Sequence, residues 1–484
     1  MEICLRLLTF NAPHSGLNDP PRFGDFQAHR HWMYLTKLPI EQWYTNNIDH
    51  SYQNTTVTQW RLDYPPITAY AHKLYSYTLP DKYSDHGNQD DILVLRMRLF
   101  ILIIDVLLLF ILKKIAKVAF SDKSVISILF AHPMLLLVDY IHYQPNNLMF
   151  LFLSITFLCI ARSFDNTNWA ILGTISFIFC IASKQMALVY APVVCISYLA
   201  LVIKEKSFYN QCILFIKLVL AVLFAFACCI LPFSINYNSL AEGISIQGPA
   251  ILSRIFPVHR GLFEDKLGNF WCISDVLFKW RLKYSEKQLA YCCTAICLLL
   301  SLPIAFKVFQ SILKTTSPQK AIDTVFLGSS ITSLIGFLFG YHIHEKTILL
   351  SIFCILLYTA NYIYKPMETK HYLLYKYLVI SSFNIYPLIE LDNAVFYFIA
   401  LHLIFKSLFT PKYKLLYYKM LIDVVYSPVI YSVLAYLHSS KIIKVNRFPQ
   451  LFALILYTWC FIGNCVACIC LIYCLWTSYK LKNH

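Results

Sequence analysis

A carboxylate with cationic neighbours stands near the start of the chain. The segment RFGDFQAHRHWM places Asp25 a few residues before His29 and Arg30. Nearby cations keep a carboxylate ionised, and an ionised carboxylate can accept a proton from a hydroxyl group as a general base. The same residues also fit a structural ion pair between Asp25 and Arg30, so the local sequence leaves both interpretations open.

Aromatic side chains and a further carboxylate follow in two short segments. EQWY contains Trp43, and WRLDYPPITAY contains Asp63 and Tyr64 directly before two prolines. Pro65 and Pro66 restrict the backbone to an extended turn, which holds the preceding side chains in a fixed direction. Aromatic walls beside a carboxylate suit sugar binding. An aromatic belt at a membrane–water interface would use the same side chains and is the alternative.

Two motifs in the second half of the chain carry cations that suit a phosphate group. RIFPVHRGLFEDK combines arginines with acidic residues, and HIHEK stands at the junction of two apolar runs. Arginine grips phosphate oxygens through paired N–H donors, and cations at a membrane interface lie at the level of lipid phosphates. The candidate phosphate-binding residues are Arg254, Arg260, His342, His344 and Lys346.

A metal site is the alternative interpretation of HIHEK. His342, His344 and Glu345 are residue types that bind metals. Ligands two residues apart at the end of a span, however, do not form the helical histidine pair of a zinc protease. We therefore expect no metal ion at this motif.

The composition indicates a membrane protein. Of the 484 residues, 58% are hydrophobic and 14% are charged, with a mean hydropathy of +0.57, which is too apolar for a soluble protein of this size. A net charge of +15 would suggest nucleic acid in a soluble chain. Here the basic residues lie mainly in short loops between apolar runs, where they orient spans, so we expect no nucleic-acid partner. Most of the 17 cysteines lie in apolar runs, where they act as small hydrophobic residues.

Apolar runs of spanning length predict an all-α polytopic membrane protein with about thirteen transmembrane helices. If the polar segment 11–92 lies in the lumen, alternation of the loops places the basic loops largely on the cytosolic side. It places the segments with candidate chemistry on the lumenal side. The candidate spans are 97–116, 124–140, 147–163, 167–183, 187–203, 211–233, 288–309, 321–341, 346–364, 373–391, 393–409, 418–438 and 450–477.

This topology divides the chain into four parts. Residues 1–92 are an N-terminal segment with the first lumenal loop, and 93–233 are the helices of the catalytic module. Residues 234–287 form a long lumenal loop, and 288–484 are the C-terminal helices with a cytosolic tail. The predicted lumenal side also carries the patch DYIHYQPNN, which begins at Asp139.

Two signals indicate the compartment. Asn54 opens an Asn-Thr-Thr sequon on the side assigned to the lumen, where asparagine glycosylation takes place. The chain ends in KLKNH, a tail similar to a cytosolic dilysine retrieval signal. Together they favour the endoplasmic reticulum membrane, with a lumenal active site.

These motifs together resemble the dolichyl-phosphate-glucose glucosyltransferases of asparagine-linked glycosylation, which belong to the GT-C superfamily. The resemblance rests on GDFQAHRHWM, LPIEQWY, LDYPP, KQM, RIFPVHRGLFEDKLGNFWC and HIHEK, in the family's order, and covers residues 20–365. The family has two siblings, which add the first and the second glucose to the lipid-linked oligosaccharide. RGLFEDKLGNFWC is similar to the first-glucose enzyme.

The resemblance implies that glucose passes, with inversion, from dolichyl phosphate glucose to the dolichyl-diphosphate oligosaccharide as an α-1,3 linkage. Asp25 matches the family's catalytic base. No cofactor is implied, because the sugar arrives on a lipid. The substrate-binding residues that the resemblance implies are Trp43, Asp63, Tyr64, His142, Gln144, Lys184, Gln185, Glu264 and Asp265.

The chain departs from the family pattern in two places. The family typically reads Asp-His-Gly-His-Phe-Gln-Tyr-Asn where this chain reads DYIHYQPNN. The family also has a full apolar span before the Gly-Asp-Phe loop, whereas MEICLRLLTF has about half the length of a span, so we expect a truncated first span. These departures leave three alternatives open: the second-glucose sibling, an inactive paralogue, and a transporter of lipid-linked sugar.

Overall fold

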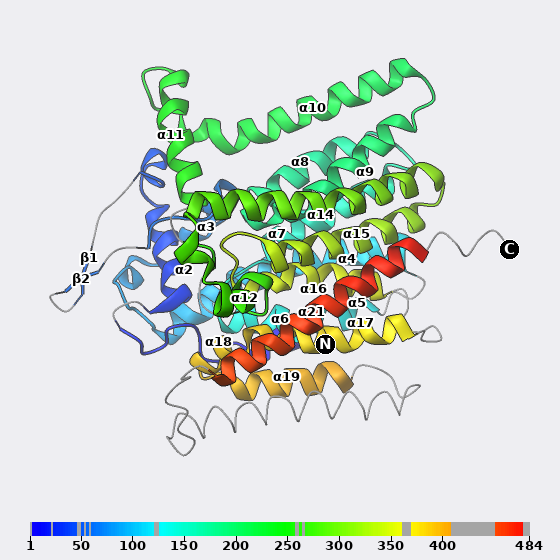
Figure 1. Ribbon diagram of the computed structural model, residues 1–484. Coiled ribbons are helices and arrows are strands. Elements are labelled where there is room, and N and C mark those ends of the chain that lie inside the picture. The colour runs from blue at the N-terminus through cyan, green and yellow to red at the C-terminus, as the bar shows by residue number, and fades with distance from the viewer. Residues whose placement is uncertain are drawn as a thin grey trace. The chain divides into compact units, whose positions relative to one another are not determined.

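The computed structural model describes most of the chain as helices (Figure 1). Two short strands, β1 (His50–Tyr52) and β2 (Thr55–Val57), form an antiparallel pair. The predicted all-α class is therefore confirmed. The described residues are 2–20, 23–45, 50–52, 55–57, 60–120, 125–256, 261–263, 267–360, 369–407 and 451–477.

The chain forms two compact units, each assembled from separated stretches of sequence. Unit 1 comprises Met1–Val118, Leu136–Leu188 and Tyr198–Pro257, and unit 2 comprises Ala119–Leu135, Val189–Ser197 and Val258–His484. The helices of unit 1 are α1 (Glu2–Leu8), α2 (Gly24–Leu35), η1 (Ile40–Gln42), α3 (Pro66–Ser76), η2 (Asp81–Tyr83), α4 (Asp91–Ala119), η3 (Leu137–Ile141), α7 (Asn147–Arg162), α8 (Trp169–Ile181), η4 (Gln185–Tyr190), α10 (Phe208–Ile230), η5 (Leu231–Phe233) and α11 (Leu240–Ile255).

The second unit contains a further set of helices, among which α15 packs against α14, α16 and α21. The helix α9 (Ala191–Ile203) has residues in both units. The others are α5 (Val125–Phe130), α6 (Pro133–Leu136), α12 (Phe270–Phe278), α13 (Trp280–Lys283), α14 (Glu286–Lys314), α15 (Pro318–Phe339), η7 (Glu345–Thr347), α16 (Ile348–Thr359), α17 (Thr369–Ile380), η9 (Ser381–Ile385), α18 (Tyr386–Leu391), α19 (Val395–Ser407) and α21 (Leu451–Thr477).

Local sequence signals explain where several of these helices begin. Ser285 caps α14 through a reciprocal pair with Gln288, in which each side chain bonds to the other residue's backbone N–H. Ser317 caps α15, whose first residue is Pro318, a position where the missing N–H of proline is harmless. The side chains of Ser207, Ser239 and Asn269 cap α10, α11 and α12.

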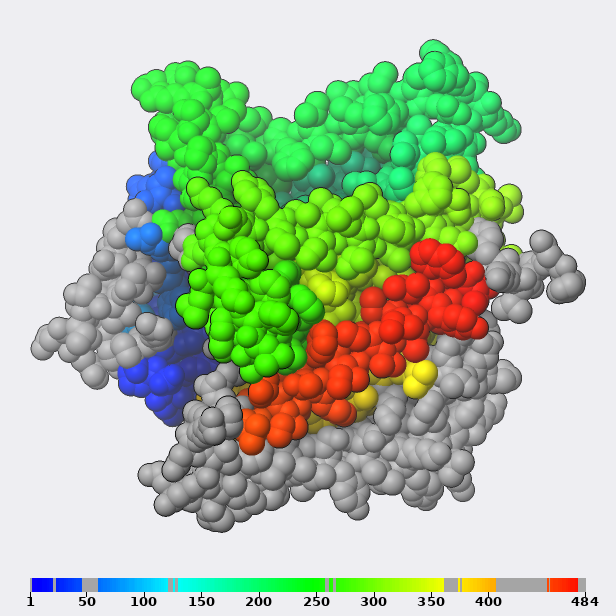
Figure 2. Space-filling view, viewed as in Figure 1, coloured from blue at the N-terminus to red at the C-terminus, as the bar shows by residue number. Residues whose placement is uncertain are grey.

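Five helical segments among the described residues are long and apolar enough to cross a membrane. They are Gln185–Ile203, Phe208–Phe233, Glu286–Lys314, Pro318–Phe339 and Ala453–Thr477. Their outward faces expose large apolar side chains such as Leu223 and Phe224 on α10 and Ile469 on α21. Figure 2 shows α21 in red, visible along its length at the surface of unit 2. Apolar faces of this size suit contact with lipid, and the chain is a polytopic membrane protein.

The predicted span over 124–140 is not one continuous helix. The structure has α5, then α6 beginning at Pro133, and then the wide turn η3. Proline disfavours helical geometry in the residue before it, which separates α5 from α6. Helices occupy the other predicted spans within the described residues, and 418–438 lies outside them.

The first ten residues form a short helix that is fastened to α4 by a buried ion pair. Arg6 and Asp105 are 1% and 3% exposed, and Arg6 Nε donates to Asp105 Oδ2 at 2.6 Å. The same carboxylate accepts hydrogen bonds from the Tyr140 hydroxyl at 3.0 Å and from Asn147 Nδ2 at 3.1 Å. A carboxylate with three donors is stable inside an apolar bundle because each lone pair that water would solvate has a partner.

Removing one member of this pair leaves the other buried without its counter-charge. We expect Asp105→Ala to lower the free energy of unfolding by about 3–5 kcal/mol, and the double variant Arg6→Met/Asp105→Leu to lose less. Thermal melting in detergent measures both. Asp81→Ala serves as the control, since Asp81 pairs with Lys37 at the surface, where such pairs contribute about 0–1 kcal/mol. Equal losses in the single and double variants would contradict the account.

Candidate active site

Asp25 lies in the first turn of α2, where its carboxylate is paired and still accessible. The backbone enters the helix through Phe23 at φ 56° and Gly24 at φ 60°. Asp25 Oδ2 lies 3.0 Å from His142 Nε2, and the two side chains are 28% and 5% exposed. Helix N-termini favour negative charge, and the imidazole orients the carboxylate from its buried side. The exposed side remains open to a substrate hydroxyl.

The alternative ion pair with Arg30 is not what the contacts of Arg30 support. Arg30 Nε donates to Gln27 Oε1 at 2.8 Å, and Nη1 donates to the carbonyls of Tyr83 and Ser84. The arginine therefore ties α2 to η2, while Asp25 contacts His142.

The patch DYIHYQPNN holds His142 in place through its own hydrogen bonds. The backbone N–H of His142 donates to Leu137 O at 2.8 Å, which closes the wide turn of η3. Asp139 Oδ1 accepts from both the backbone N–H and the side-chain amide of Asn146, at 3.1 and 2.9 Å. Tyr143 adopts a positive φ of 64°, and its hydroxyl donates to Met97 O. The patch is therefore an ordered loop with both of its ends bonded.

Lys184 reaches this patch from the end of α8. Its Nζ donates to Asn146 Oδ1 at 2.6 Å and to Gln144 Oε1 at 3.5 Å, and it lies 5.4 Å from the centre of the Tyr64 ring. The lysine is 7% exposed. Thr68 Oγ1 holds the preceding carbonyl, Ser183 O, at 2.6 Å. Lys184, Gln144 and Tyr64, which the sequence places in three separate motifs, thus meet in the structure.

Tyr64 contributes a phenol to the same cluster. Pro65 is the N-cap of α3 and Pro66 its first residue, so the predicted turn is present, and Tyr44 donates to Tyr64 O at 2.7 Å. Burial, together with nearby carboxylates that include those of Asp25 and Asp63, raises the pKa of Tyr64 well above its ordinary value. The hydroxyl stays protonated at neutral pH, and among the described residues it has no hydrogen-bond partner. It is available as a donor.

Other predicted site residues of unit 1 lie around this cluster. Trp43 is 3% exposed and packs edge-on against Phe233, with ring centres 5.7 Å apart. Gln185 Nε2 donates to Ile255 O at 2.9 Å, and Arg254 Nε lies 3.5 Å from Tyr44 O. These contacts connect the segment after α8 and the N-terminal loop to α11.

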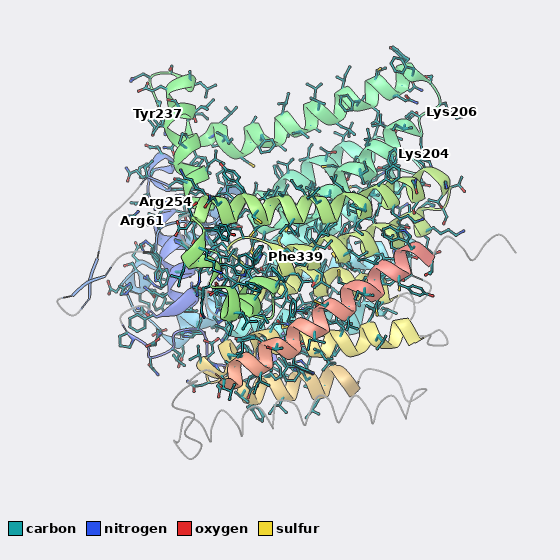
Figure 3. The ribbon with its side chains drawn as sticks, viewed as in Figure 1. Arg61, Lys204, Lys206, Tyr237, Arg254 and Phe339 are labelled. Carbon is teal, nitrogen blue, oxygen red and sulfur yellow. The ribbon has the colours of Figure 1, made fainter. Side chains whose placement is uncertain are left out.

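The elements that carry the cluster present the same ends of their helices. Asn146 directly precedes α7, Lys184 follows α8 closely, and Tyr70 of α3 donates to the carbonyls of Cys228 and Cys229 at the end of α10. Figure 3 labels Arg61 and Arg254 at this end of α10. Alternating helices meet in this way when the loops between them share one face of a membrane.

Unit 2 brings the two phosphate-type motifs together. His342, at φ 53°, donates its backbone N–H to Leu262 O at 2.7 Å, and its Nδ1 lies 3.2 Å from Gly261 O. Phe263 pairs with Ile343 in an isolated parallel bridge. The rings of His342 and His344 have centres 5.1 Å apart, and Lys346 follows in η7. Arg260, Glu264, Asp265 and the sequon residue Asn54 lie outside the described residues.

Sequence reasoning missed several polar residues of unit 1. His29 Nδ1 and His72 Nε2 lie 3.3 Å apart behind Tyr64, and burial lowers the pKa of His72 to about 3, so its imidazole is neutral. Arg98 and Asp105 are also fully buried and hydrogen-bonded. The signal for the last two was their charge inside an apolar run, since ionisable residues in spans usually have a functional or structural partner.

Fold and site together define a polytopic membrane protein whose polar chemistry is carried by loops at one end of its helices. The comparison with protein families is decisive about its class: residues 2–472 match the model of the ALG6, ALG8 glycosyltransferase family, and the chain belongs to that family. It is a glycosyltransferase.

Curated relatives agree with this assignment. The chain is 32% identical over 403 residues to the Caenorhabditis elegans probable dolichyl pyrophosphate Man9GlcNAc2 alpha-1,3-glucosyltransferase, covering 81% of this chain and 72% of the relative. It is 31% identical over 426 residues to the Gallus gallus dolichyl pyrophosphate Man9GlcNAc2 alpha-1,3-glucosyltransferase, covering 84% and 76%. The probable enzyme of the same name from Dictyostelium discoideum is 29% identical, with 84% and 75% covered.

The geometry predicts a graded dependence of turnover on His142. His142→Ala removes the side chain that orients Asp25, and we expect kcat to fall by about 10²-fold, the order of loss that follows from misplacing a reacting group. His142→Gln retains an N–H donor and should lose less. Turnover is measured on purified enzyme and normalised to folded protein. Wild-type turnover in His142→Ala would contradict a role for this contact.

Proposed function

We propose that this chain transfers glucose from dolichyl phosphate glucose to the oligomannose of a dolichyl-diphosphate oligosaccharide, forming an α-1,3 linkage with inversion. Membership of the ALG6, ALG8 family and the names of the relatives support the reaction class and the acceptor. The observation that carries the mechanism is the accessible Asp25 carboxylate held at 3.0 Å by the buried His142. A single displacement with inversion requires one base, and Asp25 has the position and the partner for that role.

The chemical step is one displacement. The acceptor hydroxyl oxygen forms a bond to the anomeric carbon while the bond from that carbon to the phosphate oxygen breaks. Asp25 takes the hydroxyl proton, and the electron pair of the broken bond leaves with dolichyl phosphate. General-base assistance of this kind contributes about 10²–10⁴ in rate. Tyr64 and Lys184 supply O–H and N–H donors beside the base and serve as sugar contacts.

The leaving group explains why a second carboxyl group is unnecessary. A glycosidase needs an acid because its leaving alkoxide is basic, whereas dolichyl phosphate leaves as a stable anion. Cations that stabilise the developing charge can take the place of the acid. His342, His344 and Lys346 of unit 2, with Arg254 and Arg260, are the candidates for this electrostatic role.

The arrangement of unit 1 supports a lumenal site in the endoplasmic reticulum membrane. Lys204 and Lys206 lie before the start of α10, and Figure 3 places them at the opposite end of this helix from Arg254. The 23 residues of α10 span about 34 Å, which is sufficient to cross a membrane. Basic residues mark the cytosolic end of a span, so the cluster around Asp25 belongs on the other side.

The first glucose is the one that we assign to this chain. The relatives compared above are named for a Man9GlcNAc2 acceptor, which carries no glucose. The motif RGLFEDKLGNFWC supports the same choice from sequence, although Glu264, Asp265 and Lys266 lie outside the described residues.

Asp25→Asn tests the reaction and the base together. Membranes with the wild type or the variant receive dolichyl phosphate glucose and either unglucosylated or monoglucosylated lipid-linked oligomannose, and products are identified by mass. We expect the wild type to add glucose to the unglucosylated acceptor and the variant to be slower by about 10²–10⁴-fold. Asp81→Asn, whose carboxylate pairs with Lys37 at the surface, should match the wild type. Wild-type turnover in Asp25→Asn would overturn the base, and transfer to the monoglucosylated acceptor instead would overturn the first-glucose assignment.

Removal of divalent metal should leave the reaction intact. The proposed chemistry uses a carboxylate base and a phosphate leaving group that side-chain cations stabilise, and none of these steps requires a metal ion. Initial rates with and without excess EDTA are the measurement. A loss that added magnesium or manganese restores would show that a cation holds the donor phosphate.

A further inference from the structure

We infer that Arg98 is a positioning residue for the reaction: its guanidinium joins the two segments that carry Asp25 and His142 and so sets the contact between them. This inference rests on the proposed function, because it concerns the base assigned there. Arg98 lies in the second turn of α4 and is 0% exposed. Burial of a cation in an apolar bundle is costly unless its donors are satisfied, so its partners indicate what it does.

The partners of Arg98 belong to two separate segments. Nε donates to Tyr140 O at 3.0 Å. Nη2 donates to Ala12 O at 2.8 Å and to Pro13 O at 2.9 Å, and Nη1 donates to Phe10 O. One planar group thus binds four backbone carbonyls, three before α2 and one in η3. Backbone carbonyls report the path of the chain, so Arg98 determines where both segments run.

The first segment leads directly to Asp25. Ser15 Oγ accepts the backbone N–H of Phe26 at 2.9 Å, and the ring of His14 stacks on that of Phe26 with centres 4.0 Å apart. A Cβ atom added to Gly24 would lie 2.8 Å from the carbonyl carbon of Ser15. The backbone after Pro13 is therefore in contact with the first turn of α2, and a shift of one moves the other.

The second segment leads to His142, two residues after Tyr140. Further bonds fasten the same patch to α4: the Tyr143 hydroxyl donates to Met97 O at 3.0 Å, and Asn147 Nδ2 donates to Ile101 O at 2.8 Å. These bonds hold the later part of the patch, whereas Arg98 holds the carbonyl that precedes His142. Loss of the Arg98 contact should therefore change the position of the imidazole more than the fold of the patch.

Arginine is the residue type that this position requires. Its guanidinium has five N–H donors in a planar fork, which can reach carbonyls on different sides at once. Lysine keeps the charge but concentrates three donors on one atom, so it cannot hold both segments in the observed arrangement. Arg98→Lys is thus a conservative test of geometry at constant charge.

A double-mutant cycle between Arg98 and His142 tests the inference. We expect Arg98→Lys to lower kcat by about tenfold or more, with the KM values of donor and acceptor nearly unchanged, because the loss lies in the alignment of the reacting groups. In a His142→Ala background the same substitution should have little further effect, since the contact that Arg98 sets is already gone. Arg98→Gln, which removes the charge, should behave in the same way. All rates are normalised to folded protein from size-exclusion chromatography.

The controls separate this inference from the proposed function. Arg96→Lys, two residues earlier on α4, changes an arginine that donates to Thr78 O outside these segments and should leave kcat unchanged. Equal losses from Arg98→Lys with and without His142, or unchanged kcat per folded molecule, would overturn the positioning role while Asp25→Asn stays inactive. If Asp25→Asn retains wild-type turnover in the same assay, the base assignment and the inference that depends on it both fail.

Discussion

The buried charges of α4 constrain the whole of unit 1. An apolar bundle gives an isolated charge no solvation, so every ionised group inside it must be satisfied by protein. Asp105 meets this requirement with Arg6, Tyr140 and Asn147, and Arg98 meets it with four carbonyls. These partners come from the N-terminal segment and from the patch that carries His142. Because the charges have to be paired, the two segments have to come together.

The catalytic pair follows from that arrangement. Asp25 begins a helix whose first turn contacts the N-terminal segment, and His142 follows the turn that Arg98 holds. A carboxylate and an imidazole 117 positions apart in sequence therefore meet at 3.0 Å. Lys184 and Tyr64 reach the same place from α8 and from the start of α3. The departures of this chain from the family pattern leave this cluster intact, since the patch still supplies the histidine that contacts Asp25.

The sequence predicted the class of fold well and the site in part. Apolar runs and serine caps depend on neighbouring residues, so they can be recognised along the chain, and Asp25 was identified by its polar surroundings and by the resemblance. The break before Pro133 was visible as a proline within a predicted span. The pairing of Asp25 with His142 rather than with Arg30 was not, because it depends on a contact between distant segments. Arg98 and Asp105 belong to the same category: their charge marked them, but their partners lie far away in sequence.

The most direct test of the account is a cryo-EM structure of the Asp25→Asn enzyme with dolichyl phosphate glucose and the unglucosylated lipid-linked acceptor bound. The account predicts an acceptor hydroxyl within about 3 Å of the side chain at position 25 and on the face of the glucose opposite its phosphate, as a general base in a single displacement requires. An acceptor hydroxyl that instead contacts a different carboxylate, with position 25 out of reach, would contradict the assignment of Asp25 as the base.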